Sequence, residues 1–255
     1  MTETRSPGEK VMGPPTMVVG ASRGLGRGIA LAFAAGGTRV VAVARTASAL
    51  ADLAAHHGNI CPEVADAGDP TVAGGLLDRH EPQTLILVAG ASPLMRPLQQ
   101  QTWETFSVNW HTDVRIAFHW LREVLLKPLA PGSRVMVVSS GAAMAGSPLS
   151  GGYAGAKATQ RFITGYAQEE ANRAGLEITF TAILPRITPL TDLGAPAVRA
   201  YVARAGQSEQ EYLRQLGDPL SPEAAGAALV QLARSEVAAV APGYLLTSAG
   251  LRPLS

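Results

Sequence analysis

Short apolar runs alternate with segments of helical periodicity along the chain. A run such as 17–19, which ends at a glycine, is typical of a buried strand, whereas Leu25, Ile29 and Phe33 recur at helical spacing until Gly36 stops the helix. The segment 188–220 shows no clear period and is predicted to be irregular. The pattern predicts strands at 17–19, 40–43, 59–64, 85–88, 134–138, 178–184 and 244–247, and further helices at 49–56, 72–80, 102–126, 153–174 and 222–235.

The order of these elements predicts the fold class. Strands and helices that alternate at this spacing indicate βαβ units and a parallel sheet, and right-handed crossovers then give an α/β, doubly wound, Rossmann-like fold. The length of 255 residues suits one such domain, and the sequence has no internal repeat or linker. We therefore predict a disordered tail over residues 1–15 and a single domain over residues 16–255.

Composition narrows the classes of partner. The net charge of +1, with basic residues scattered, indicates neither a nucleic-acid surface nor a membrane partner, and no apolar stretch is long enough for a membrane span. Charged residues make up only 16% of the chain, as suits a sheet buried on both faces. Because Cys61 is the single cysteine, no disulfide can form within the chain, so we expect a cytoplasmic protein in which Cys61 is buried.

A glycine-rich loop joins the first strand to the first helix. It has the spacing G-x-x-x-G-x-G over Gly20, Gly24 and Gly26. Glycines allow positive φ and close backbone approach, and a helix N-terminus presents free N–H groups to phosphate. The loop therefore predicts a dinucleotide site. The alternative is an ordinary glycine-rich turn, which could have the same sequence pattern.

The residues after the second strand bear on the choice of cofactor. An acidic residue there would bind the ribose hydroxyls of NAD, but the strand continues into Ala44, Arg45 and Thr46. Arg45 offers a planar set of donors suited to a phosphate, and Arg23 in the glycine loop could reach the same group. Two arginines without a carboxylate favour NADP(H) over NAD, the alternative being that both are solvated surface charges.

Tyr153 and Lys157 lie four residues apart at the start of a predicted helix, and therefore on one face. A nearby ammonium favours the phenolate form of a tyrosine, so such a pair can donate and accept protons. The spacing is common by chance on surface helices. However, Ser140 ends the fifth predicted strand thirteen residues earlier, at the sheet edge where ligands bind, and its hydroxyl could polarise a substrate oxygen.

From about Thr16 onward, these motifs resemble the short-chain dehydrogenase/reductase family. The resemblance implies that Tyr153 exchanges a proton with the substrate oxygen, that Ser140 positions that oxygen and that Lys157 binds the nicotinamide ribose. It also implies a proton relay through Asn109 and an adenine contact at Asp66. The cofactor-binding residues that it implies are Gly20, Ser22, Arg23, Gly24, Leu25, Gly26, Arg45, Asp66, Ala89, Gly90, Tyr153, Lys157, Pro185 and Thr188.

The chain departs from the family pattern at three positions. The family's Asn-Asn-Ala-Gly is Leu87-Val88-Ala89-Gly90, which loses an amide near the cofactor. The family's Pro-Gly is Pro185-Arg186, which places a charge near the pocket mouth where it could bind an anionic substrate or face solvent. Leu190 stands where a hydroxyl residue is common.

Two functions remain open at this point. The first is an NADP(H)-dependent oxidoreductase that transfers a hydride between nicotinamide and a ketone or secondary alcohol. The second is an NADP-binding sensor or scaffold without turnover, which the departures at Val88 and Arg186 suggest. The two histidines on the Asn109 helix, His111 and His119, lack the further ligands of a metal site, so we expect no metal.

The expected partners are a small-molecule carbonyl or alcohol and further copies of the chain. Segments 92–96, 142–152 and 188–217 are predicted to wall the substrate pocket, the last as a lid. The residues expected to line it include Leu94, Met95, Met144 and Leu149, and we expect an apolar substrate of medium size. Members of the family commonly form dimers or tetramers through the two long helices. We therefore expect a homo-oligomer, which a 26 kDa species in light scattering would contradict.

Overall fold

The computed structural model describes residues 13–254, and most of the predicted tail (residues 1–12) lies outside this part of the chain. An eight-stranded sheet with the strand order β3-β2-β1-β4-β5-β6-β7-β8 organises the fold. β1 to β7 are parallel, and β8 pairs antiparallel to β7. The strands are β1 (Thr16–Val19), β2 (Val40–Ala44), β3 (Ile60–Val64), β4 (Thr84–Leu87), β5 (Arg134–Val138), β6 (Thr179–Pro185), β7 (Gly243–Thr247) and β8 (Gly250–Pro253).

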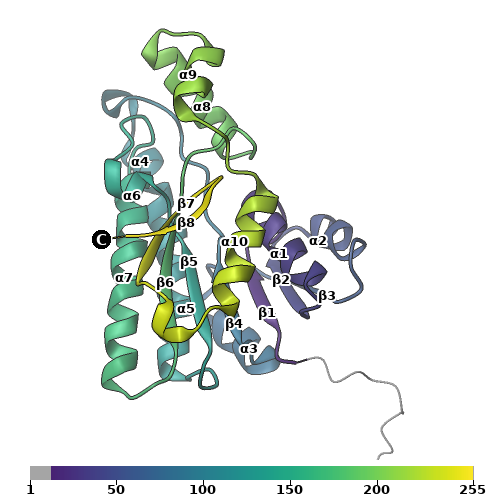
Figure 1. Cartoon of the computed structure of the whole chain (residues 1–255). Helices are drawn as coiled ribbons and strands as arrows, with labels where there is room; N and C mark the ends of the chain where they lie inside the picture. Colours follow the sequence, from purple (N-terminus) through teal and green to yellow (C-terminus); the bar gives the residue numbers. More distant parts are fainter. Residues whose placement is uncertain (1–12, 255) are drawn as a thin grey trace, which may run out of the picture.

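Helices cover both faces of the sheet (Figure 1). On one face, alternate strand residues pack with α1 (Gly24–Ala35), α2 (Ala47–Ala54) and α10 (Pro222–Arg234). The other strand residues pack with α3 (Pro70–His80), α5 (Arg115–Leu126) and α7 (Tyr153–Arg173) on the opposite face. Because both faces are buried, the strands need continuous apolar runs, and this is why the sequence pattern located them. The predicted doubly wound α/β fold is confirmed.

The seven predicted strands are confirmed to within one residue at each end, but β8 was not predicted. The predicted helix 102–126 is wrong as a continuous helix. It consists of α4 (Trp103–Asn109), a π-helical turn η2 (Trp110–Val114) and α5. A π turn shifts the hydrogen-bond pattern by one residue, and such turns are frequent at functional sites.

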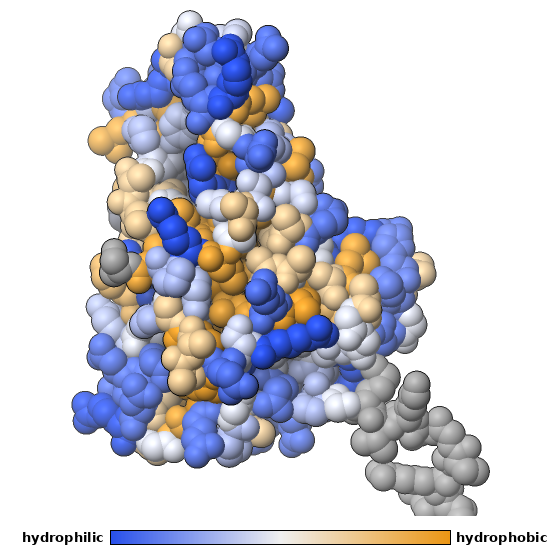
Figure 2. Space-filling model, viewed as in Figure 1, coloured by the Kyte–Doolittle hydropathy of each residue, from blue (hydrophilic) through white to orange (hydrophobic). Residues whose placement is uncertain are grey.

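The prediction that 188–220 is irregular is also wrong, because α8 (Gly194–Ala205) and α9 (Glu209–Leu216) form there. α8 is alanine-rich. At the start of α9, the Ser208 side chain accepts a hydrogen bond from Glu211 N and so acts as the N-cap of that helix. We call α8 and α9 the cap, since they rise above the rest of the molecule in Figure 1. Hydrophilic residues cover much of the cap in Figure 2, with apolar residues exposed below it.

Smaller elements complete the chain. They are η1 (Leu98–Gln100), α6 (Ala142–Ala145) and η3 (Val237–Ala239). Cys61, predicted to be buried, is partly exposed because β3 is the edge strand of the sheet. Among the described residues, no helix combines the length and apolar character that a membrane span requires.

Candidate active site

A cavity of about 1030 Å³ opens at the carboxyl edge of the sheet. The loops after β1 to β6 wall it, together with the cap. β1 and β4 are neighbours where the strand order reverses, and ligands bind at this point in open α/β sheets. Asn109 does not line the cavity. The other predicted site residues do: Gly20, Ser22, Arg23, Gly24, Leu25, Gly26, Arg45, Asp66, Ala89, Gly90, Ser140, Tyr153, Lys157, Pro185 and Thr188.

The glycine loop has the tight geometry that its sequence predicts. Gly20 and Gly24 have φ values of +99° and +53°, where glycine is favoured. A Cβ at Gly20 would lie 2.5 Å from the backbone N of Ala89, and a Cβ at Gly26 would overlap the carbonyl oxygen of Gly20. The first turn of α1 has neither a side-chain cap nor an acidic residue, so its N–H groups are open to an anion from the cavity.

Polar side chains lie at the end of the cavity formed by β1 to β3. Arg23 and Arg45 are exposed and follow the neighbouring strands β1 and β2. Nη1 of Arg23 lies 3.8 Å from Oδ2 of Asp192, but both side chains are well exposed, so this pair contributes little to stability. Asp66 follows β3 and its Oδ1 accepts a hydrogen bond of 2.9 Å from Gly68 N. This end therefore offers two cations, Arg23 and Arg45, and two carboxylates, Asp66 and Asp192.

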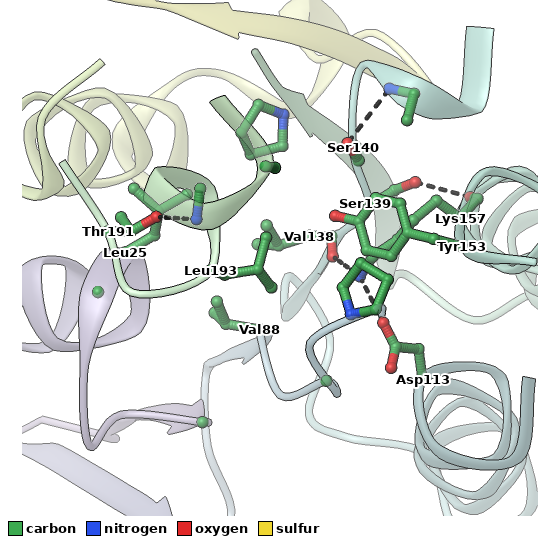
Figure 3. Close-up of a pocket in the computed structure, with 18 of the residues that line it drawn as sticks. Leu25, Val88, Asp113, Val138, Ser139, Ser140, Tyr153, Lys157, Thr191 and Leu193 are labelled. Carbon is green, nitrogen blue, oxygen red and sulfur yellow. Dashed lines mark hydrogen bonds and ion pairs between the residues drawn. The ribbon is translucent and has the colours of Figure 1, made fainter. Parts of the chain in front are cut away.

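Ser140, Tyr153 and Lys157 meet on the opposite side of the cavity (Figure 3). Ser140 is the second residue after β5, and its Oγ accepts a hydrogen bond of 3.2 Å from Ala142 N. Tyr153 is the first residue of α7, and Nζ of Lys157 lies 5.5 Å from the centre of its ring. The three side chains predicted from the motif are therefore brought together by the end of β5 and the start of α7.

Lys157 is buried and bound by three acceptors. Its Nζ lies 3.0 Å from Oδ2 of Asp113, 3.0 Å from Oε1 of Gln160 and 3.4 Å from the carbonyl oxygen of Val138. Burial lowers the pKa of Lys157, but the charges of Asp113 and Tyr153 and the hydrogen bond to Asp113 outweigh burial and raise it above its usual value.

Sequence reasoning missed Asp113 and Gln160. Asp113 lies on η2 with its side chain about 1% exposed. The available signal was spacing, since Asp113 follows Asn109 by four residues and Gln160 follows Lys157 by three, each on one helical face.

Asn109 is fully buried behind the cavity wall. Its Nδ2 donates to the carbonyl oxygen of Ala91 at 2.7 Å and to Oδ1 of Asp113 at 3.2 Å. The side chain therefore braces the loop after β4 and the Asp113 carboxylate. The role of Asn109 in a proton relay stays a prediction.

The segment after β6 runs along the cavity. Thr188 is buried, and its Oγ1 accepts from Leu190 N at 3.3 Å. Thr191 Oγ1 accepts from Gly194 N at 3.0 Å and lines the cavity, whereas Leu190 is exposed outside it. Arg186 is exposed at the rim. Thr191, rather than Leu190, therefore brings a hydroxyl side chain into the cavity wall of this segment.

The cavity wall formed by the three segments predicted to contact substrate is mainly apolar. Segments 92–96, 142–152 and 188–217 all contribute to it, but Leu94 and Leu149, which we expected there, do not. Tyr201 and Tyr212 of the cap were not predicted. The hydroxyl of Tyr201 lies 2.6 Å from Oγ of Ser147, and burial together with Tyr201 raises the pKa of Tyr212. The apolar lining residues here include Met95, Met144, Leu193, Ala197 and Leu216.

Two further features concern metals and assembly. Among the described residues, no group of His, Cys, Asp and Glu side chains could hold a metal ion. α5 and α7 carry the exposed aromatic residues Phe118, Phe162 and Tyr166, on the two helices through which we expect copies of the chain to associate. That association stays a prediction.

Comparison of sequences identifies the relatives of this chain. The family model described as short chain dehydrogenase matches residues 15–201. Carbonyl reductase [NADPH] 2 from Sus scrofa is 32% identical over 126 residues, which is 48% of this chain and 52% of the relative. L-xylulose reductase from Homo sapiens is 34% identical over 103 residues, covering 40% of this chain and 42% of the relative. The matched part thus spans about half the length of these curated relatives or less.

Comparison of structures agrees on the fold. A short chain dehydrogenase from Mycobacterium avium superposes with a TM-score of 0.76 at 23% identity, covering 96% of this chain and 86% of that chain. A substituted actinorhodin polyketide ketoreductase with NADPH superposes with a TM-score of 0.77 at 20% identity, covering 91% and 94%. At these identities the match establishes the fold and nothing more.

Proposed function

The chain belongs to the short chain dehydrogenase family, and from that premise we propose that it is an NADP(H)-dependent oxidoreductase acting on a ketone or secondary alcohol. The observation that supports this most directly is that Ser140, Tyr153 and Lys157 line the same cavity as the glycine loop. One relative is named a carbonyl reductase that uses NADPH, and another an L-xylulose reductase.

The residues around the cavity suit NADP(H). The uncapped N-terminus of α1 offers N–H donors for a diphosphate, and Arg23 and Arg45 offer cations for the additional phosphate of NADP(H). No acidic residue follows β2 directly to bind the ribose hydroxyls of NAD. Asp66, Ala89 and Gly90 would border the adenosine, while Pro185 and Thr188 would border the nicotinamide.

The catalytic roles follow from side-chain chemistry. The bound cofactor supplies or accepts the hydride. Ser140 donates a hydrogen bond to the substrate oxygen and so holds it in place. The Tyr153 hydroxyl gives its proton to that oxygen during reduction and recovers it during oxidation. The Lys157 ammonium beside the ring stabilises the negative charge that Tyr153 carries after the proton has left.

The lining of the cavity end next to the cap favours an uncharged, largely apolar substrate. Met95, Met144 and Leu193 offer apolar surface, and the hydroxyls of Ser147 and Tyr201 offer a local hydrogen-bonding point. A polyhydroxylated sugar would have to leave many hydroxyls without partners against this wall, which is costly. We therefore propose an apolar ketone of medium size, with Arg186 at the rim facing solvent.

Turnover tests the proposal. We would follow NADPH and NADH consumption with a panel of ketones and aldehydes, and compare Tyr153→Phe with the parent. Loss of the acid/base group is expected to lower kcat about 100-fold or more. Tyr166→Phe, which alters an exposed tyrosine of the same helix, is the matched control and should leave kcat unchanged.

Two outcomes would count against the proposal. Full turnover in Tyr153→Phe would exclude the mechanism. NADPH binding without turnover on any member of the panel would favour a sensor or scaffold, in which Val88 and Arg186 adapt the cavity to binding alone.

A further inference from the structure

The buried ion pair between Asp113 and Lys157 stands directly beside the Tyr153 ring (Figure 3). We propose that Asp113 is a positioning residue for the reaction, whose carboxylate holds the Lys157 ammonium charged and fixed beside Tyr153. This rests on the proposed function, because Lys157 affects turnover only if Tyr153 transfers the proton. The family motif contains Tyr153 and Lys157 but predicted nothing at position 113.

The ion pair and two hydrogen bonds form a closed set of contacts. Lys157 Nζ contacts the Asp113 carboxylate and Gln160 Oε1, both at 3.0 Å. Gln160 Nε2 in turn donates to the main-chain carbonyl of Asp113 at 2.9 Å. Lysine has a flexible side chain, so two acceptors linked to each other restrict its ammonium to one place.

The Asp113 carboxylate is itself fixed from the side opposite Lys157. Its Oδ1 accepts from Ala91 N at 2.8 Å and from Asn109 Nδ2 at 3.2 Å. A Cβ at Gly90 would lie only 2.6 Å from Oδ2 of Asp113. The carboxylate therefore occupies the space that a side chain at position 90 would need. The π turn η2 and the loop after β4 thus place this charge with little freedom to move.

The charges around Lys157 determine its protonation. Among the described residues, the titratable groups that influence Lys157 are Asp113 on η2 and Tyr153 on α7. Burial acts to deprotonate the amine, and the Asp113 charge reverses that effect, so the pKa of Lys157 is raised. A raised lysine pKa means that the pair stabilises the fold below the unfolded-state pKa, and that this contribution is lost as the pH rises through the folded-state value.

Lysine NMR can test the pair directly, because the sequence has three lysines, Lys10, Lys127 and Lys157. In the 255-residue chain labelled with ¹³C at lysine Cε, without cofactor, the Lys157 signal of Asp113→Asn should titrate at lower pH than in the parent. The control is Asp78→Asn, which removes the carboxylate of the exposed Asp78–Lys127 pair and should leave the Lys157 titration unchanged. An unchanged Lys157 titration in Asp113→Asn would overturn the proposal.

The pH profile of turnover provides the functional arm. In Asp113→Asn, kcat/KM should fall about tenfold more at alkaline than at neutral pH, because Lys157 loses its charge earlier. A structural role alone would lower activity by the same factor at every pH, and that result would also overturn the proposal. A parent without turnover would refute the proposed function, and with it the role in the reaction, whereas the NMR titration would still show whether Asp113 holds the lysine charged.

A second variant covers the case in which Asp113→Asn does not fold. Removing one partner of a buried pair leaves an uncompensated charge, and removing both does not. Asp113→Asn/Lys157→Met should therefore fold, with a cooperative thermal unfolding transition, under conditions in which Asp113→Asn does not. A double variant that also failed to fold would mean that the carboxylate does not compensate the lysine, and the proposal would fail.

Discussion

The two ends of the cavity are built in different ways. At the glycine-loop end, backbone hydrogen bonds hold the loops to neighbouring strands, as from Gly20 N to Val43 O at 2.8 Å and from Ala89 N to Val19 O at 2.9 Å. At the cap end, side chains from segments outside the sheet face one another, and the hydrogen bond between Ser147 and Tyr201 joins α8 to the loop after α6. The first end is fixed by sheet register, while the second depends on side-chain contacts.

This difference predicts how each end responds to substitution. A change in the glycine loop displaces backbone that the sheet holds, so binding and folding should suffer together. A change in the cap should alter substrate affinity and leave the fold intact, since elements with few buried contacts open at low free-energy cost.

The largest effect is expected for Gly26→Ala. The new Cβ would overlap the carbonyl oxygen of Gly20, so the loop must shift away from α1. We expect a loss of about 1–3 kcal/mol in the free energy of unfolding, typical of overpacking, and a loss of NADPH affinity of about 100-fold or more, because the N–H groups no longer converge. Denaturant unfolding and fluorescence titration with NADPH measure the two effects.

Gly75→Ala is the matched control for this substitution. Gly75 lies in α3 with nothing within 4 Å of a Cβ. Alanine should stabilise that helix by about 0.5–1 kcal/mol and leave NADPH affinity unchanged. If Gly26→Ala folded and bound NADPH like the parent, the sheet would not hold the backbone of the glycine-loop end rigidly in place.

An intermediate effect is expected for Arg45→Ala. If Arg45 binds the additional phosphate of NADP(H), its removal loses a charge-assisted hydrogen bond. Such a bond contributes about 1.5–3 kcal/mol, so NADPH should bind at least about tenfold more weakly while NADH affinity changes little. Arg173→Ala, at the far end of α7, is the control. Equal losses for both cofactors would place Arg45 outside the phosphate site.

The same contrast explains what the sequence could predict. The apolar runs of the strands, the glycine loop and the residues Ser140, Tyr153 and Lys157 are local patterns, and the structure brings them to one cavity. The spacing from Asn109 was the one local sign of Asp113. It did not reveal the role of this residue, because an acidic residue on an amphipathic segment looks like one that faces solvent. Asp113 is buried on the π turn η2, where it pairs with Lys157 of α7. No local sequence pattern specifies this packing.

The cap shows a second limit. Gly194 begins α8 and Gly206 follows its last residue. These glycines interrupt the helical periodicity of the sequence, which therefore favours an irregular segment as the prediction. The N-cap residue Ser208 and the alanine-rich run of α8 were visible signals for helices. However, the packing of these helices decides which of their side chains enter the cavity. Sequence alone therefore did not single out Tyr201 and Tyr212.

The smallest effect is expected for Tyr201→Phe. The substitution keeps the ring that lines the cavity and removes the hydroxyl that lies 2.6 Å from Ser147 Oγ. A neutral hydrogen bond contributes about 1 kcal/mol. If these hydroxyls bind the substrate, KM for the best ketone of the panel should rise about fivefold, with the unfolding midpoint nearly unchanged. Ser147→Ala removes the same bond from its other side and should give a similar KM.

Arg199→Ala, on the same helix but outside the cavity lining, should leave KM unchanged. If Tyr201→Phe instead lowered the unfolding midpoint without changing KM, the hydrogen bond would serve the fold, and the cap would resemble the glycine-loop end rather than differ from it.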